Sequence, residues 1–384
     1  VNNLVIGSGT TFSNEGVNNS LTVTKHIDLT GTLNVNAAGT MSTGTMTLRD
    51  TSTLTNTGTI TVTGNDKANS PTGSGYNWRN METDGTAFVP SAGTVHFVGT
   101  GIANGYIVES RFFDFIFDIT GGGDIQWLDA DNNTMTIGGD CTIVEGQLKR
   151  NAESDTLVVT GDVSIESGGR LGDDDDTGPN TFGSLTIASG GTYSATSGTT
   201  TITGTGTIIN IDGTFTHNNG KVTITGSGDH QTLLPGGATF NNIDLDTTSG
   251  HDTKLQEDII ILGTLDLTDS TDYWIVDANG AGANVTMTMG SSTAQGTIES
   301  AYDSRFRLNP GSSAKCIIQG ASTVNPCKVT SNDWYWDYGS GAAGTELANI
   351  DFQTDLETHK GGSNTAKITL TGDCEFDAVT VSSG

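Results

Sequence analysis

Four consecutive aspartates are the residues of this chain best suited to hold a metal ion. Asp173, Asp174, Asp175 and Asp176 stand where the sequence predicts a turn. Calcium takes several oxygen ligands at about 2.3–2.6 Å, so carboxylates gathered in one turn would suit it. An exposed, solvated loop tip is the alternative, and we favour it because consecutive side chains point in different directions. Calcium is therefore the one ion to test, and the sequence predicts no cofactor that the chain requires.

Aromatic residues gather near position 335 and could bind a sugar. Trp334, Tyr335, Trp336 and Tyr338 have an aspartate on either side of the first three. In a strand, alternation would put both tryptophans on one face and Tyr335 on the other. Aromatic faces stack on sugar rings while carboxylates bind hydroxyl groups, which predicts a glycan site. Equally, the cluster could close a hydrophobic core or cover a junction between modules.

The four cysteines show no C-x-x-C pair, so zinc or redox chemistry is not indicated. Cys141 and Cys374 each follow Gly-Asp, at the place that Val163 takes in a similar segment, and are expected to be core residues. Cys316 and Cys327 are close enough in sequence to bridge two neighbouring strands. A disulfide between them is therefore one expectation, and two free thiols are the alternative.

No pattern of catalytic residues stands out. With 44 acidic residues, pairs of carboxylates at any spacing arise by chance. The six histidines show neither metal-ligand spacing nor a companion nucleophile motif. We therefore predict that the chain is not an enzyme, and keep a polysaccharide depolymerase as the least favoured alternative.

The charge balance restricts the partners. The formal net charge is −28, which would repel a nucleic acid backbone along most of the surface. No run of eighteen apolar residues exists, so no membrane span is expected. The sequence begins with Val, and we expect a processed chain or a segment of a longer protein.

Short strands must position all of these residues. Apolar and polar residues alternate over four to six positions, as in 21–24, 33–36 and 60–63, and Gly, Asn or Asp closes each run. Such alternation is typical of half-buried strands joined by tight turns. No segment has apolar residues at helical spacing, which predicts almost no helix.

Internal repeats decide between the possible all-β folds. Segment 44–64 matches 183–204, and three further pairs of matching segments follow in the same order. They predict three modules: 1–150 with an insertion near 65–83, 151–270, and 271–384 as a partial repeat with the aromatic loop.

A fine repeat through the whole chain favours a parallel β-solenoid (β-helix) of stacked short strands with loop insertions. Like residues one coil apart would lie about 4.8 Å from each other, where threonines can form ladders. Coils of roughly 20–25 residues would give about sixteen of them. Modules folded as β-sandwiches and joined by a long linker are the alternative.

Three segments carry a resemblance to known proteins: GSLTIASGGTYSATSGTTTITG (183–204), DGTFTHNNGKVTITG (212–226) and TFNNIDLD (239–246). They resemble repeats of phage tail-fibre and virion structural proteins and of bacterial adhesin-like surface proteins, many from marine or environmental sequence. The resemblance implies a β-solenoid surface fibre, and it assigns no catalytic residue.

Taken together, these features predict a structural, self-associating fibre or filament protein, extracellular, on a cell surface or in a virion. Its expected partner is itself, as a homo-oligomer or an end-to-end filament. The alternative function is that of a glycan- or receptor-binding adhesin or tail spike.

Overall fold

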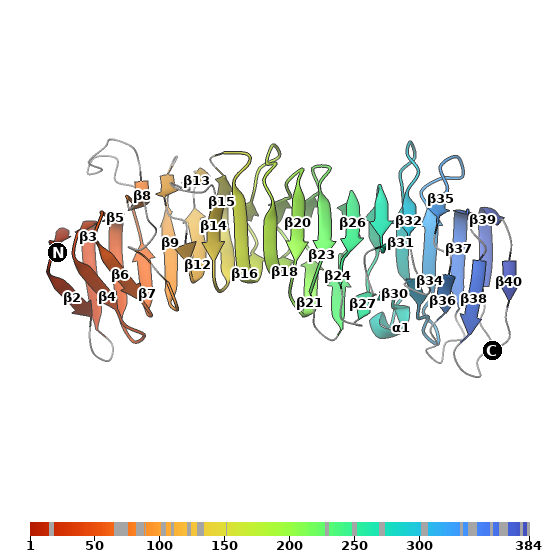
Figure 1. Ribbon diagram of the computed structural model, residues 1–384, viewed down its shortest axis with the longest axis horizontal. Coiled ribbons are helices and arrows are strands. Elements are labelled where there is room, and N and C mark those ends of the chain that lie inside the picture. Colours follow the sequence, from red (N-terminus) through yellow and green to blue (C-terminus); the bar gives the residue numbers. More distant parts are fainter. Residues whose placement is uncertain are drawn as a thin grey trace. The chain divides into compact units, whose positions relative to one another are not determined.

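The computed structural model is a parallel β-solenoid of about 13 turns, with 61% strand and 1% helix (Figure 1). This confirms the predicted fold class over the β-sandwich alternative. The structure describes residues 1–14, 19–64, 76–81, 88, 90–100, 105–108, 111–120, 124–128, 134–150, 152–226, 230–247, 252–268, 273–300, 306–330, 333–336, 344–353, 356–360, 368–376 and 379–381.

The chain forms two compact units, residues 1–183 with 187–196, and residues 184–186 with 197–384. The first unit contains β1 (Asn3–Ile6), β2 (Thr11–Asn14), β3 (Ser20–Leu29), β4 (Thr32–Val35), β5 (Thr40–Leu48), β6 (Thr53–Asn56), β7 (Thr59–Val62), β8 (Tyr76–Asn80), β9 (Thr94–Thr100), β10 (Gly105–Val108), β11 (Arg111–Phe112), β12 (Asp114–Thr120), β13 (Asp124–Leu128), β14 (Thr134–Ile137), β15 (Cys141–Arg150), β16 (Thr156–Ile165), β17 (Gly169–Leu171) and β19 (Thr192–Ser194). Strand β18 (Asn180–Ile187) has residues in both units.

The second unit contains β20 (Thr199–Ile202), β21 (Gly206–Ile211), β22 (Thr214–Thr216), β23 (Lys221–Ile224), β24 (Gln231–Leu234), β25 (Thr239–Phe240), β26 (Asn242–Leu245), β27 (Asp252–Leu255), β28 (Ile259–Ile261), β29 (Thr264–Asp266), β30 (Tyr273–Val276), α1 (Ala278–Ala281), β31 (Val285–Met289), β32 (Thr297–Glu299), β33 (Phe306–Leu308), β34 (Cys316–Gly320), β35 (Cys327–Val329), β36 (Asp333–Trp336), β37 (Thr345–Phe352), β38 (Leu356–Lys360), β39 (Ile368–Phe376) and β40 (Val379–Val381). The three modules predicted from the repeats remain a description of the sequence.

Strands of successive turns pair in parallel and in register, which lines up the inward residues. In the first unit Ile60 pairs with Val95, Val95 with Phe115, Phe115 with Cys141, and Cys141 with Val163. All five are buried. Cys141 therefore occupies the same core column as Val163, as its sequence context predicted.

Side chains at the turn corners add bonds between successive turns. Asp114 Oδ1 accepts a hydrogen bond from the amide of Asp140 (3.1 Å), and Asp140 Oδ1 accepts one from the amide of Asp162 (2.9 Å). In the second unit, Asn242 Oδ1 does the same for the amide of Thr264 (2.8 Å). Asp and Asn side chains thus accept hydrogen bonds from backbone amides that have no partner in the strand ladders.

Turns of unequal length explain why there are fewer of them than the sixteen expected. Lys221 pairs with Asn242, and the length of chain between them is close to the predicted spacing. The partner of Val285 in the following turn is Cys316, which lies much further along the chain. The longer turns of the second unit also carry α1, a single helical turn that Asp277 caps by accepting a hydrogen bond from the Gly280 amide.

Part of the predicted insertion near 65–83 is a strand. Residues 76–80 form β8, which pairs with β5 and β10. Trp78 is buried there, and its ring lies 5.5 Å from Phe88, 6.3 Å from Phe97 and 5.7 Å from Phe112 between centroids. Trp78 therefore fills the core, because β8 continues the ladder of the preceding turn.

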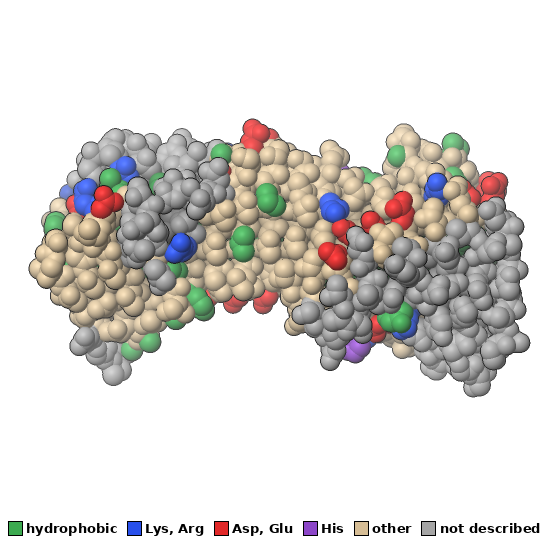
Figure 2. All heavy atoms as spheres, in the orientation of Figure 1, with side chains coloured by type: hydrophobic (Ala, Val, Ile, Leu, Met, Phe, Trp, Pro, Cys, Tyr) green, Lys and Arg blue, Asp and Glu red, His purple; other side chains and the backbone are tan. Residues whose placement is uncertain are grey.

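The described part of the face seen in Figure 2 is neither strongly apolar nor uniformly charged. On the face shown in Figure 2, much of the area with described side chains is neither charged nor hydrophobic. This agrees with strands whose outward positions carry mainly Thr, Ser and Asn. Among the described residues, no helix is long and apolar enough to cross a membrane.

Candidate functional site

The four aspartates lie in the turn between β17 and β18. Gly172 opens this turn with φ +84, a conformation that glycine adopts without strain. The carboxylates then bind amides of their own turn: Asp176 Oδ2 accepts from the Asp173 amide (3.1 Å), and Asp173 Oδ1 accepts from the Asp174 amide (3.0 Å). Carboxylate oxygens that could bind a cation therefore accept hydrogen bonds from the amides of the turn itself.

Basic side chains from neighbouring strands also face this turn. Asp173 lies 3.4 Å from Lys149 Nζ and 3.6 Å from Arg170. Asp174 lies 3.5 Å from Arg170, and its Oδ1 accepts a hydrogen bond from Ser194 Oγ (3.0 Å). These partly exposed pairs neutralise charge at the loop tip, and each adds little to stability.

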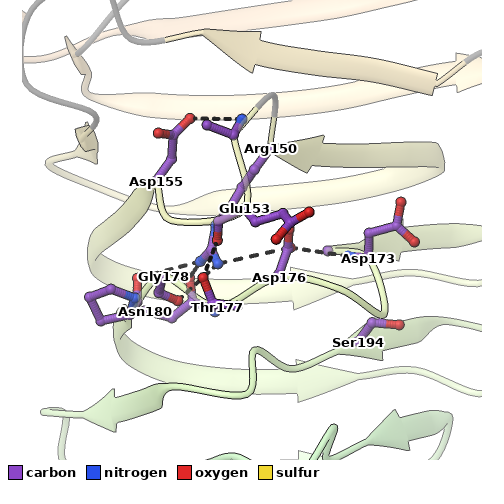
Figure 3. A network of polar contacts seen from close by, with 12 residues as sticks. Arg150, Glu153, Asp155, Asp173, Asp176, Thr177, Gly178, Asn180 and Ser194 are labelled. Atoms are coloured by element: carbon purple, nitrogen blue, oxygen red, sulfur yellow. Dashed lines mark hydrogen bonds and ion pairs between the residues drawn. The ribbon is translucent and has the colours of Figure 1, made fainter.

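Arg150 reaches the buried side of the same turn (Figure 3). Its side chain is 1% exposed, and its Nη1 lies 3.9 Å from Asp176 Oδ2, which belongs to a side chain that is 4% exposed. Nη1 donates to the carbonyl oxygen of Gly178 (2.8 Å), and Nη2 donates to Asn180 Oδ1. The guanidinium thus occupies the place that a metal ion could take, beside oxygen atoms of residues 176–180.

Two further residues complete the arrangement, which we call the Arg150 network: Arg150, Asp155, Asp176, Asn180 and Tyr193. Asn180 Nδ2 donates to the hydroxyl of Tyr193 (2.7 Å). Asp155 Oδ2 accepts from the amide of Ala152 (3.3 Å), and its charge acts on Arg150. All five residues are buried.

Burial sets the electrostatics of this network. Desolvation raises the pKa of Asp176 above its ordinary value, and the attraction of Arg150 offsets only part of that. Burial likewise lowers the pKa of Arg150, while the charge of Asp176 acts in the opposite direction. Desolvation therefore outweighs the attraction within the pair, as is common for buried ion pairs.

Calcium binding at Asp173, Asp174, Asp175 and Asp176 stays a prediction, because carboxylates of this run are engaged with amides and basic side chains of the fold. Among the residues that the structure describes, no group of three or more His, Cys, Asp or Glu side chains is arranged to hold a metal ion. Sequence reasoning missed the role of Arg150, although a signal existed. Alternation in β15 puts Arg150 in phase with Leu148, and both are buried.

The aromatic residues predicted to bind a glycan are only partly described. Backbone pairing aligns Trp334 with Phe306 and Trp336 with Leu308, whereas Tyr335 aligns with Arg307. Phe306 and Leu308 are buried, and Arg307 is not. In the backbone register, Tyr335 thus aligns with a residue that is not buried, and the two tryptophans align with buried ones. Tyr338 lies outside the described residues.

The predicted disulfide between Cys316 and Cys327 is absent, and both thiols are free and buried. Cys316 in β34 pairs with Thr345, whereas Cys327 in β35 pairs with Ile350, so the two occupy different ladders. Burial raises the pKa of Cys316 to about 12, and it also raises that of Cys327. Both residues serve as core side chains.

Comparisons with protein-family models, curated proteins and solved structures found no match to this chain. The resemblance to phage and bacterial surface proteins therefore remains a prediction from the repeats.

Proposed function

We propose that this chain is a structural fibre protein of a cell surface or virion, which associates with further copies of itself and catalyses no reaction. The observation that carries the proposal is the parallel, in-register pairing of successive turns in each unit. In β7, for example, Ile60 is paired with Met41 of the preceding turn and with Val95 of the following one.

Such pairing supports a mechanical role. A strand held on both sides leaves the stack only when two ladders of hydrogen bonds break. The bonds from Asp114, Asp140 and Asn242 to following turns add further links between turns. A stack of this kind resists extension without needing metal ions or disulfides.

The location can be tested with labelled antibodies and electron microscopy of native material. Labelled tail fibres or particle projections would support a virion component, and labelled filaments or envelope would support a cellular surface fibre. Label confined to the cell interior would contradict the proposal. Sedimentation over a wide concentration range tests self-association, and a monomer throughout would remove that part.

Mechanical function calls for its own measurement. The purified chain, held between two handles and extended, should resist and then lengthen in steps of about one turn, roughly 20–30 residues each. Smooth lengthening at low force would contradict the load-bearing role, whatever the location.

Glycan attachment is the second candidate, and one contact favours it. The guanidinium of Arg307 lies 3.2 Å from the centroid of the Tyr273 ring, and Tyr335 follows Arg307 in the next turn. A cation stacked on one tyrosine, with a second tyrosine next in its own row, suits a sugar ring with polar substituents. Tyr335→Ala should weaken binding on a glycan array, whereas Lys254→Ala, three turns before Tyr335 in that row, should not.

A further inference from the structure

Two rows of hydroxyl side chains cross four adjacent parallel strands of the first unit. The strands are β3, β5, β7 and β9, and the rows follow their register. The first row consists of Ser20, Thr40, Thr59 and Thr94, and the second of Thr22, Ser42, Thr61 and finally His96. We call the seven serines and threonines the hydroxyl array.

The array is regular because the strands beneath it are fixed. Between its two rows stand the inward residues Met41, Ile60 and Val95, each no more than 1% exposed. Neighbouring strands are about 4.8 Å apart, and residues two positions apart on one strand are about 6.6 Å apart. The array therefore presents hydroxyl groups on a rigid two-dimensional lattice with these two repeats.

The hydroxyl groups of the array have no partners within the described part of the chain. None of the seven hydroxyl groups takes part in a hydrogen bond there, although the backbone carbonyl oxygens of Thr40 and Thr94 accept from Asn14 and Asn56. Elsewhere in the same unit such groups are engaged: Ser13 Oγ accepts from Asn34 Nδ2 (3.0 Å), and Thr43 Oγ1 donates to the carbonyl oxygen of Thr45 (2.8 Å). The array keeps its capacity for an external partner.

The chemistry of the array restricts what that partner can be. It contains no carboxylate, cation or aromatic ring, although the chain carries a net charge of −28. A dissolved sugar would gain little, because exchanging a water for one hydroxyl contributes only about 1 kcal/mol and the ligand must be ordered. A periodic solid that matches both repeats would instead engage all seven groups at once.

We propose that the hydroxyl array binds the surface of ice. A hydroxyl group can both donate and accept, as every water molecule of ice does. Hexagonal ice repeats its oxygen positions along one axis at a spacing only slightly shorter than that between neighbouring strands. Its repeat in the perpendicular direction is close to that of alternate residues along a strand. The inference is independent of the fibre proposal.

The test is partitioning of the full chain, at micromolar concentration, into a slowly growing ice hemisphere, together with inhibition of ice recrystallisation. The natural chain should enter the ice, whereas Thr61→Lys should be excluded like an inert protein. Thr59→Lys is the second variant. Thr201→Lys is the matched control, since Thr201 is an outward threonine of β20 whose row continues to Asp244. Melting curves establish that each variant folds.

Each outcome is decisive. Exclusion of the natural chain from ice, or equal entry of the natural chain and both folded array variants, would overturn the proposal. Exclusion from ice combined with binding to microcrystalline cellulose or chitin that Thr61→Lys abolishes would replace ice by a crystalline polysaccharide. Entry that depends on Thr59 and Thr61 but not on Thr201 would support it.

Discussion

The guanidinium of Arg150 lies 3.9 Å from the carboxylate of Asp176, and both side chains are buried in the first unit. Replacing Arg150 by Met should lower the free energy of unfolding by about 3 kcal/mol, because it leaves a buried carboxylate and the Gly178 carbonyl without their donor. Urea unfolding measures this. Arg170→Met, at a more exposed arginine of β17 that contacts Asp173, should change stability by less than about 0.5 kcal/mol. Equal losses would contradict the assigned role.

The raised pKa of Asp176 predicts a pH dependence of known sign. Between the ordinary value, 3.8, and the higher value in the folded state, the folded protein binds more protons than the unfolded one. The contribution of this residue to stability is therefore fully present at the lower pH, and falls as the pH rises through that window. Asp176→Asn cannot titrate. The stability of the natural chain minus that of Asp176→Asn, from urea unfolding at several pH values, should fall with rising pH; a rise would refute the sign.

Interturn bonds at the corners should contribute measurably. Asp140→Ala removes the acceptor of the Asp162 amide and should cost about 0.5–1.5 kcal/mol. Asp140→Asn keeps an oxygen in the same place and should cost less. Chemical denaturation of the three chains would decide this, and identical stabilities would show that water replaces the bond without loss.

All four cysteines should be present as thiols. In denaturant, a thiol reagent should titrate four groups per chain, with or without prior reduction. In the folded protein Cys141 and Cys316 should react slowly, because both are buried and burial raises the pKa of each to about 12. A reductant should leave the melting temperature unchanged. Recovery of only two thiols without reduction would contradict this prediction and support a disulfide.

Removal of calcium should have no effect on the first unit. Carboxylates of the Asp173–Asp176 turn bind amides and basic side chains, so excess EDTA should leave the melting temperature where it was. Calorimetric titration with calcium gives a second readout. Saturable binding that Asp175→Asn weakens would show that the turn rearranges around the ion.

Local patterns predicted the fold because the parallel solenoid repeats one local arrangement. Alternation, as in residues 60–63, identified the inward positions, and the matching Gly-Asp contexts placed Cys141 beside Val163. Both inferences need only the strand period and the repeat. The number of turns was overestimated, because the sequence does not show how much chain a turn such as that from Val285 to Cys316 will absorb.

The candidate sites were harder to predict, because they depend on which turn lies beside which. The acidic run at Asp173–Asp176 suggested calcium, but the sequence could not show that Arg150 would reach it from another turn. Cys316 and Cys327 are near in sequence, yet they lie on different ladders of the solenoid. Proximity along the chain was therefore a poor guide to proximity in space.

Pairing between neighbouring turns also has a consequence for how the chain acquires its structure. The partner of Thr40 in the following turn is Thr59, and the partner of Lys221 is Asn242, so the strands that must meet are never far apart in sequence. Folding slows as contacting residues become more distant along the chain, and most all-β proteins fold slowly for this reason. Here a first pair of turns can serve as a template for the next, and folding can advance in one direction while the rest of the chain is still being made.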